Sequence, residues 1–336
     1  MYRWLIVAPL SVALGWLFSA VNVPAAWILG AIVASGAMAL GSARELHIDT
    51  RFYALSRGII GVLAALPLDG VPPSQLAGYI VPGIVAAAVT TGVGVAGGFV
   101  LARHSGLSRE TGVLSMLAGG ASIMPAIAAD LGADIRFVAL TQYLRLLAVS
   151  LTLPIAASFL VAPSATGVER PAAQWWMWLL VLAIAAGAGP LARLVHIPVP
   201  SVFGPLLVAV AVGAFLDVPL VMPQPLAILA FLAVGWACGG GLSVPALKLF
   251  ARELPVTVTY IVVVMAACAA MGWVVSVWLG ISFFEGYLAT SPGALETVLA
   301  LSAEGGAGPA VIALQLIRLI AVLLIAGFLP QLLRRR

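Results

Sequence analysis

The sequence predicts an all-α polytopic membrane protein with two inverted repeats, each of about five spanning helices plus one glycine-broken re-entrant element. Three observations carry this prediction: 63% of the residues are hydrophobic and only 8% are charged, long apolar runs recur along the chain, and similar segments occur twice. Soluble domains carry roughly 25% charged residues, so the composition excludes an ordinary soluble protein. The runs are continuous and near the ~20 residues that a spanning helix needs, which favours helices over barrel strands.

Six apolar elements are predicted in each half of the chain. They occupy residues 4–21, 25–42, 53–68, 76–102, 110–130 and 135–162, and then 174–195, 201–217, 224–246, 254–279, 283–304 and 309–333. The first run resembles a signal peptide in composition, but it has a counterpart at 174–195, so we expect it to be retained. The predicted domains are therefore two membrane repeats, residues 1–162 and 175–336, joined by a polar stretch.

The repeat itself is inferred from identical residues at a nearly constant offset. An offset of 173 pairs Gly120 with Gly293, Gly132 with Gly305, Val138 with Val311, Gln142 with Gln315, Arg145 with Arg318 and Val149 with Val322. An offset of 174 pairs Gly15 with Gly189, Gly30 with Gly204, Gly61 with Gly235 and Gly98 with Gly272. These matches cover most of each half, which indicates a duplicated unit.

The charges of the loops predict the orientation of the repeats. If the fifth element of each half enters and leaves the membrane on one side, the basic residues collect at cytoplasmic ends. These residues are Arg3, Arg44, Arg51, Arg103, Arg109, Arg136, Arg193, Lys248, Arg252 and the three terminal arginines. The opposite loops carry Asp69, Glu169, Asp217 and Glu285. An odd number of crossings then inverts the second half, as in many secondary transporters, and both termini are predicted to be cytoplasmic.

Each fifth element contains a break rich in glycine, within LAGGASIMPAIAADLG (residues 117–132) and TSPGALETVLALSAEGG (from residue 290). Such a break at membrane depth is tolerated only where it is buried in protein or lines a wet cavity. The following half-helix offers amide groups to an anion or polar acceptor. An alternative is that the glycines only permit close helix packing. The break residues predicted to contact a solute are Gly119, Gly120, Ser122, Ser291, Pro292 and Gly293.

Arg145 and Arg318 are predicted to lie deep in the membrane. Each is about ten residues into the last helix of its half, so it sits roughly 15 Å deep in a core of ~30 Å. Gln142 and Gln315 precede these arginines by three residues and share their helical faces. Two interpretations stay open: the two pairs contact a solute, or each arginine caps carbonyl groups of the neighbouring break or pairs with an acid.

Glu296 is predicted to lie in the first turn of the half-helix that follows Gly293. It could bind a proton or cation that drives transport, or it could be a capping acid or the counter-ion of Arg145 or Arg318. The corresponding residue in the first half is Ile123, so any such role is asymmetric. The acids that close the two breaks are expected to be interfacial; they are Asp130, Asp134 and Glu304.

Neither a metal site nor a cofactor is predicted. Cys238 and Cys268 lie in apolar runs and are expected to be buried thiols. The histidines His47, His104 and His196 are far apart in sequence and lack metal-ligand spacing.

The segments GGASIMPAIAADLGADIRFVALTQYLRLLAV and YLATSPGALETVLALSAEGGAGPAVIALQLIRLIAVLL resemble the duplicated AbrB membrane family of bacterial inner-membrane proteins. That family is often labelled as an ammonia monooxygenase or a regulator of gene expression, and it is unrelated to the small DNA-binding protein of the same name. Its members commonly have SPGG in the second break and often in the first. Here Ala118 and Gly119 stand where that serine and proline would, so only Ser291 could supply a ligand-binding hydroxyl of this motif, with Ser122 as a shifted substitute.

The preferred function is secondary transport of a small polar or anionic solute across the bacterial inner membrane by alternating access. The alternative is a membrane sensor or regulator that affects gene expression indirectly, without transport. A monooxygenase-type enzyme is least favoured, because the chain offers no plausible ligand set for copper or iron. The expected partners are the solute and the lipid bilayer, with self-association left open. Direct binding to nucleic acid is not expected, because the longest polar connections, about ten to fifteen residues, are too short for a DNA-binding domain.

Overall fold

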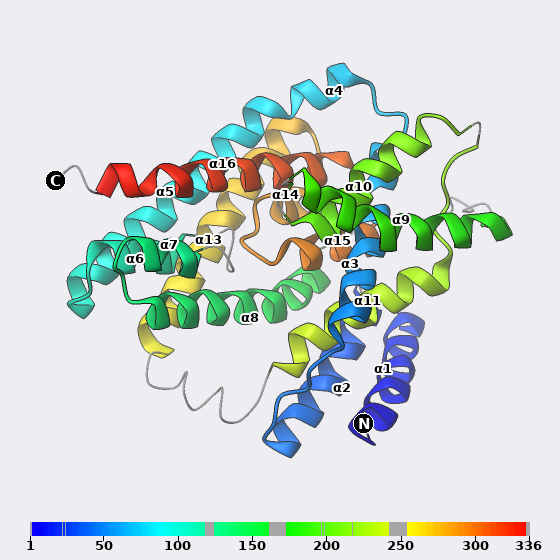
Figure 1. The fold of residues 1–336 in the computed structure, drawn as a ribbon, viewed down its shortest axis with the longest axis horizontal. Helices are drawn as coiled ribbons and strands as arrows, with labels where there is room; N and C mark the ends of the chain where they lie inside the picture. The colour runs from blue at the N-terminus through cyan, green and yellow to red at the C-terminus, as the bar shows by residue number, and fades with distance from the viewer. Residues whose placement is uncertain are drawn as a thin grey trace. The chain divides into compact units, whose positions relative to one another are not determined.

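The computed structural model describes residues 2–21, 23, 25–117, 124–160, 173–195, 197, 199–216, 218–241 and 254–333. Over these residues the chain consists of helices joined by connections, as Figure 1 shows, and the described residues contain no strand. The prediction of an all-helical fold is therefore confirmed.

The helices follow the predicted elements closely. In the first half they are α1 (Tyr2–Ala20), α2 (Ala26–Ser42), α3 (Thr50–Ala65) with a 3-10 turn (Leu66–Leu68), α4 (Pro73–Gly78), α5 (Ile80–Ser105), α6 (Arg109–Met116), α7 (Met124–Asp130) and α8 (Ile135–Phe159). In the second half they are α9 (Trp175–Leu194), α10 (Pro200–Gly213), α11 (Gln224–Gly240), α13 (Leu254–Leu279), α14 (Phe283–Thr290), α15 (Leu295–Glu304) and α16 (Pro309–Leu333).

The helices also have the dimensions of a membrane protein. Within the described residues, five are long and apolar enough to cross a bilayer: Arg3–Ala20, Thr50–Leu68, Pro73–Ser105, Trp175–Leu194 and Val262–Leu279. Shorter apolar helices cover Ala26–Ser42, Pro200–Gly213, Gln224–Gly240 and Pro309–Val322. Large apolar side chains of these helices, such as Leu5 and Trp175, are exposed on the outside of the protein, as expected for side chains that face lipid.

Equivalent helices in the two halves begin and end with the same local geometry. Ser108 and Ser282 both have φ −63° and ψ 152°, and each caps its helix by accepting a backbone N–H three residues later. Gly132 and Gly306 both have a left-handed backbone, with φ 66° and 68°. The predicted pairing of Gly132 with Gly305 is therefore wrong by one residue. The offset is therefore 174 at this glycine, and it is 173 at the glutamines, because Gln142 comes ten residues after Gly132 whereas Gln315 comes nine residues after Gly306.

Packing divides the chain into two compact units that do not follow the two halves. The first unit comprises Met1–Pro72, Leu151–Lys248 and Leu295–Pro309, and the second comprises Pro73–Ser150, Leu249–Ala294 and Ala310–Arg336. The first three helices of both halves, with α15, thus belong to the first unit, while α5, α6, α13, α14 and α16 belong to the second. The boundary between the predicted repeats at residues 162–174 falls mostly outside the described residues and stays a prediction.

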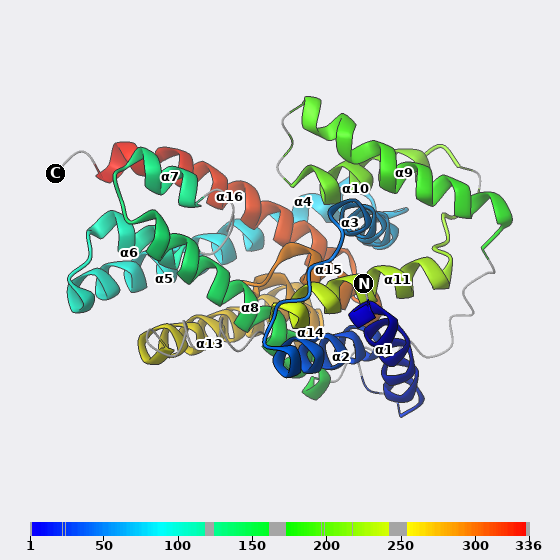
Figure 2. The ribbon, with the colours of Figure 1, turned by 60° about the horizontal axis from the view of Figure 1, so that its bottom comes forward.

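In the first unit, α2 packs against α1 and α11, and α3 packs against α9, α10, α11 and α15 (Figure 2). Its core contains Val7, Ala31, Leu232 and Trp236. The indole Nε1 of Trp236 donates to Ser11 Oγ at 2.8 Å, so the polar edge of this buried ring is satisfied.

In the second unit, α5 packs against α6 and α13, and α13 packs against α14. Glycines allow the backbones of these hairpins to touch. A Cβ atom on Gly98 of α5 would lie 2.5 Å from the Cα atom of Val113 in α6, and one on Gly272 of α13 would lie 2.9 Å from the carbonyl carbon of Gly286 in α14. The two hairpins therefore use the same device at equivalent positions.

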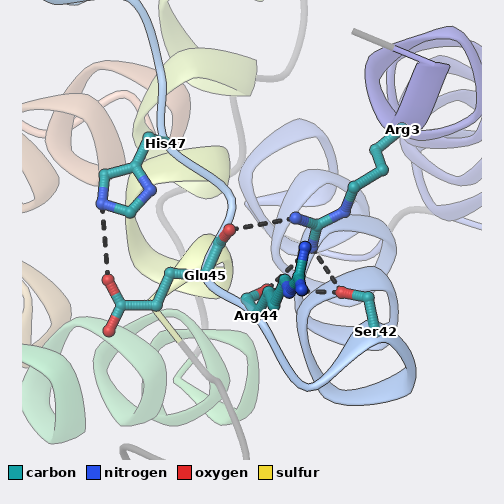
Figure 3. A network of polar contacts seen from close by, with 5 residues as sticks. All are labelled: Arg3, Ser42, Arg44, Glu45 and His47. Atoms are coloured by element: carbon teal, nitrogen blue, oxygen red, sulfur yellow. Dashed lines mark hydrogen bonds and ion pairs between the residues drawn. The ribbon is translucent and has the colours of Figure 1, made fainter.

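A polar network joins the start of α1 to the loop after α2 (Figure 3). The Arg3 guanidinium donates to the carbonyl oxygens of Arg44 at 2.7 Å and Glu45 at 3.1 Å, and to Ser42 Oγ at 2.5 Å. His47 lies beside the Glu45 carboxylate, with 3.5 Å between Nε2 and Oε2. Arg3 thus satisfies carbonyl groups just beyond the C-terminus of α2, where a cation is favourable.

Replacing Arg3 with glutamine should lower the thermal midpoint of the detergent-purified protein slightly, because the loss of these partly exposed hydrogen bonds costs about 1 kcal/mol. Differential scanning fluorimetry would measure the shift. Arg51→Gln is the matched control, since Arg51 is exposed at the start of α3. Equal midpoints for the two variants would contradict a clamping role for Arg3.

Candidate functional site

The first break begins where α6 ends. The carbonyl oxygen of Leu117 accepts from Arg145 Nη1 at 2.8 Å and from Gln142 Nε2 at 3.0 Å. Gln142 Nε2 also donates to the Leu114 carbonyl at 2.6 Å, and its Oε1 accepts from Arg145 Nη2 at 2.8 Å. The glutamine and arginine of α8 therefore act together on the last carbonyl groups of α6.

The second break repeats this arrangement where α14 ends. Arg318 Nη1 donates to the Ser291 carbonyl oxygen, and Gln315 Nε2 donates to the Leu288 carbonyl oxygen at 2.6 Å. The Ser291 hydroxyl also donates to the Leu288 carbonyl, at 3.1 Å. The side chain of Ser291, which was predicted to contact a solute, is fully buried and serves the end of α14.

These contacts agree with the interpretation in which each arginine caps carbonyl groups of the neighbouring break. The C-terminal end of a helix carries unpaired carbonyl groups and a partial negative charge, so a guanidinium is favourable there. Arg145 and Arg318 are only 4% and 8% exposed, and Gln142 and Gln315 are also buried. Contact of these four side chains with a solute stays a prediction. In the structure they bind backbone oxygens at the ends of α6 and α14, and Arg145 also binds Gln142.

Of the other predicted break residues, some lie outside the described part of the chain and some lie within it. Gly119, Gly120 and Ser122 lie outside the described residues. Pro292 is buried and Gly293 is half-buried in the connection that ends α14 and precedes α15. The predicted break at this position is confirmed.

Glu296 lies in the first turn of α15, as predicted. Its Oε1 accepts from the Tyr53 hydroxyl at 3.3 Å and lies 3.8 Å from Arg57 Nε. Tyr53 and Arg57 belong to α3, and the guanidinium carbon of Arg57 lies 5.8 Å from the centre of the Tyr53 ring. The ion-pair partner of Glu296 in the structure is therefore Arg57, a residue that was not among the predicted site residues.

Arg57 could have been found by the criterion that identified the deep arginines. It lies seven residues after the start of α3, hence about 10 Å along that helix, inside a run long and apolar enough to span a membrane. A charge at that depth usually faces a partner or a water-filled cavity. Arg145 and Arg318 are conspicuous because an arginine recurs in both halves. Arg57 has no such counterpart, since the residue 174 positions later is Phe231, and comparison of the two halves therefore does not reveal it.

Other polar side chains of α15 also face helices of the first unit. Thr297 Oγ1 lies 3.9 Å from Cys238 Sγ of α11. At the other end of α15, Glu304 Oε1 accepts from the backbone N–H of Trp27 in the first turn of α2, at 3.2 Å. Glu304 Oε2 is buried without a hydrogen bond, although the residue as a whole is half-exposed. Glu304 thus acts as a cap for α2, a role that the sequence did not indicate.

Of the other acids expected at the interface, Asp134 is exposed and its Oδ1 accepts from the Phe137 backbone N–H at 3.1 Å. The side chain of Asp130 is outside what the structure describes. Cys238 and Cys268 are buried and are not joined in a disulfide, which confirms that prediction. Among the described residues, no three of the side chains His, Cys, Asp and Glu gather as metal ligands would.

Comparison with known proteins shows which family the chain resembles. The model of a family described as "Transition state regulatory protein AbrB" matches residues 27–334. The chain is 32% identical to "Putative regulator AbrB" of Escherichia coli (strain K12) over 333 residues, which cover 96% of this chain and 94% of that protein. It is 27% identical to "Uncharacterized protein YhjN" of Bacillus subtilis (strain 168), over 59% of this chain and 56% of that protein. Because the family model and the E. coli relative match along nearly the whole sequence, the chain belongs to the AbrB family.

Proposed function

We propose that the protein is a secondary transporter that moves a small polar or anionic solute across the bacterial inner membrane by alternating access. The observation that carries this proposal is the pair formed by Glu296, at the start of a half-helix, and Arg57, within a spanning helix. Ionisable groups at such depth are costly and usually mark a pathway for a solute or an ion. Broken helices are likewise where secondary transporters place their sites.

The division into two compact units supports alternating access. This mechanism moves a packed body as a whole, and each unit has its own hydrophobic core. The break between α14 and α15 also lies where the chain passes from the second unit to the first. Pro292 and Gly293 supply a connection at that point that is not helical.

The orientation that we propose has inverted repeats, cytoplasmic termini and cytoplasmic basic loops. Arg51 lies in the first turn of α3 and Asp69 directly follows the 3-10 turn after α3; both are exposed and should face opposite sides of the membrane. In a background without the native cysteines, Asp69→Cys should react with an impermeant maleimide in intact cells. Arg51→Cys should react only after permeabilisation. The opposite pattern would reverse the orientation, and labelling of both in intact cells would contradict α3 as a spanning helix.

Flux through purified protein tests the proposal directly. In proteoliposomes, we expect saturable uptake of at least one member of a panel of labelled monocarboxylates, dicarboxylates and amino acids. Arg57→Ala should reduce that uptake by at least about tenfold, because it removes the deep cation that faces the solute. Glu45→Gln is the control, since Glu45 lies in an exposed loop. Flux that is unchanged in Arg57→Ala would separate transport from this site.

The alternative is a membrane sensor that binds a solute without moving it. The E. coli relative is named as a regulator, which favours this alternative for that protein. Binding of a probe with no flux in the same proteoliposomes would decide for the sensor. We propose no enzymatic activity for this chain.

A further inference from the structure

Arg57 carries more hydrogen-bonding capacity than the protein uses. Its Nε lies in an ion pair with Glu296 at 3.8 Å, but this nitrogen is buried without a hydrogen bond. None of the guanidinium N–H groups of Arg57 donates a hydrogen bond to a described residue, although a guanidinium has five such donors. The side chain is 26% exposed, so it is not fully enclosed by the protein.

The contacts of Glu296 are also loose. A charge-assisted hydrogen bond between a guanidinium and a carboxylate normally spans about 2.7–2.9 Å. The Glu296 carboxylate is 3.8 Å from Arg57 Nε and 3.3 Å from the Tyr53 hydroxyl, and its side chain is 17% exposed. By contrast, Arg145 donates to its carbonyl partner at 2.8 Å. Arg57 and Glu296 are thus close enough to balance each other's charge, but no short hydrogen bond joins them.

Charge balance decides what can bind there. With both side chains ionised the pair is neutral, so an anion entering alone would leave an uncompensated negative charge in a poorly solvated site, which is costly. If Glu296 is neutralised by a proton, Arg57 retains one positive charge and its free donors. A carboxylate fits these donors through two parallel hydrogen bonds, and a single negative charge restores neutrality.

We propose that this site binds a small monocarboxylate together with one proton, with Arg57 holding the carboxylate and Glu296 holding the proton. The inference rests on the proposed transport function, for which it supplies the substrate class and the coupling ion. A proton from the aqueous phase bonds to a Glu296 carboxylate oxygen. The ion pair of Arg57 with Glu296 is exchanged for an ion pair of Arg57 with the solute, and no other covalent bond forms or breaks.

The groups around Glu296 are compatible with this exchange. From α3 it faces Tyr53 and Arg57, and α11 contributes the thiol of Cys238 beside Thr297. The other acid of α15, Glu304, is eight residues away at the opposite end of the helix, on the backbone of Trp27. Arg57 is therefore the one cation in contact with Glu296 among the described residues. The start of α15 adds a partial positive charge that also favours an anion.

Calorimetric titration with L-lactate tests the proposal on the full chain in lipid nanodiscs. In buffers of different ionisation enthalpy, the wild-type protein should take up about one proton per bound lactate, and its affinity should rise as the pH falls. Glu296→Gln should bind lactate without proton uptake and with an affinity that hardly depends on pH. Glu45→Gln should behave like the wild type.

Arg57→Lys should weaken lactate binding by at least about tenfold, because an ammonium cannot make the two parallel hydrogen bonds of a guanidinium. Lactate binding without proton uptake in the wild type would overturn the proposal, and so would the absence of binding. Glycine binding that is lost in Glu296→Gln would also overturn it, because the site would then hold a zwitterion between its two charges. Proton-linked lactate binding without flux would support this site and contradict transport, so the two failures are distinguishable.

Discussion

Replacing Gly286 with leucine should prevent the accumulation of folded protein, and Gly286→Ala should cost about 1–3 kcal/mol of stability. A Cβ atom at this position would overlap the carbonyl oxygen of Gly272 in the neighbouring helix and lie 3.1 Å from Ser276 Cβ. The carbonyl oxygen of Gly272 belongs to the backbone of α13 and cannot move aside by itself. To make room for the Cβ atom, α13 and α14 would have to separate. Fluorescence-detected size-exclusion chromatography after heating would measure the loss.

The control for this prediction is another helical glycine of the same unit. A Cβ atom on Gly92 of α5 would meet no other atom within 4 Å, so Gly92→Ala should leave stability unchanged or raise it by up to about 1 kcal/mol. Gly112→Ala should resemble Gly286→Ala, because Gly112 meets Gly98 in the equivalent hairpin. Equal stabilities of Gly92→Ala and Gly286→Ala would show that the hairpins do not depend on backbone contact.

Arg318→Ala and Arg145→Ala should each lower stability by about 2–3 kcal/mol, because each leaves a buried carbonyl group at a helix end with weaker hydrogen bonding. The affected oxygens are those of Ser291 and Leu117, where the glutamine of each pair is left at 3.4 Å and 3.0 Å. Unfolding in a titration with a denaturing detergent would report the change. The two variants should be similar, since the two clamps have similar contacts.

Arg103→Ala is the matched control for the two clamps, because Arg103 is exposed in the last turn of α5 and should contribute little. The same variants separate the two interpretations of the glutamine and arginine pairs. If Arg318→Ala kept the stability of the wild type but abolished solute binding, Arg318 would be a substrate contact and not a clamp.

Much of the fold could be predicted because its signals are local. Each predicted apolar element became a helix, or a pair of half-helices, within a few residues, since continuous apolar runs and glycine-rich breaks act over short distances. The break before α15 and the position of Glu296 followed from the same local signals. The spacing of Gln315 and Arg318 also predicted that they would share a face.

The partners of these residues could not be predicted, because they depend on which distant segments pack together. Nothing near Glu296 in the sequence indicates Tyr53 or Arg57, which lie more than two hundred residues earlier. The repeat also directed attention to pairs of residues, whereas Glu296 and Arg57 have no charged counterparts. A search for asymmetry within the repeat would have found both: at the offset of 174 that the structure supports here, the counterpart of Glu296 is Ser122, not Ile123, and that of Arg57 is Phe231.

The interleaving of the two compact units has a consequence for how the protein is made. Each unit contains residues of both halves, up to Pro309 in the first unit and from Ala310 onward in the second, so neither can form before much of the second half has been synthesised. If the helices span a membrane as proposed, those of the first half lack their final neighbours until the second half has been inserted. Contacts between residues so distant in sequence form slowly. Two fragments divided at residues 161–172 would each lack the partners of their own helices, and only their joint expression in one membrane would restore both cores.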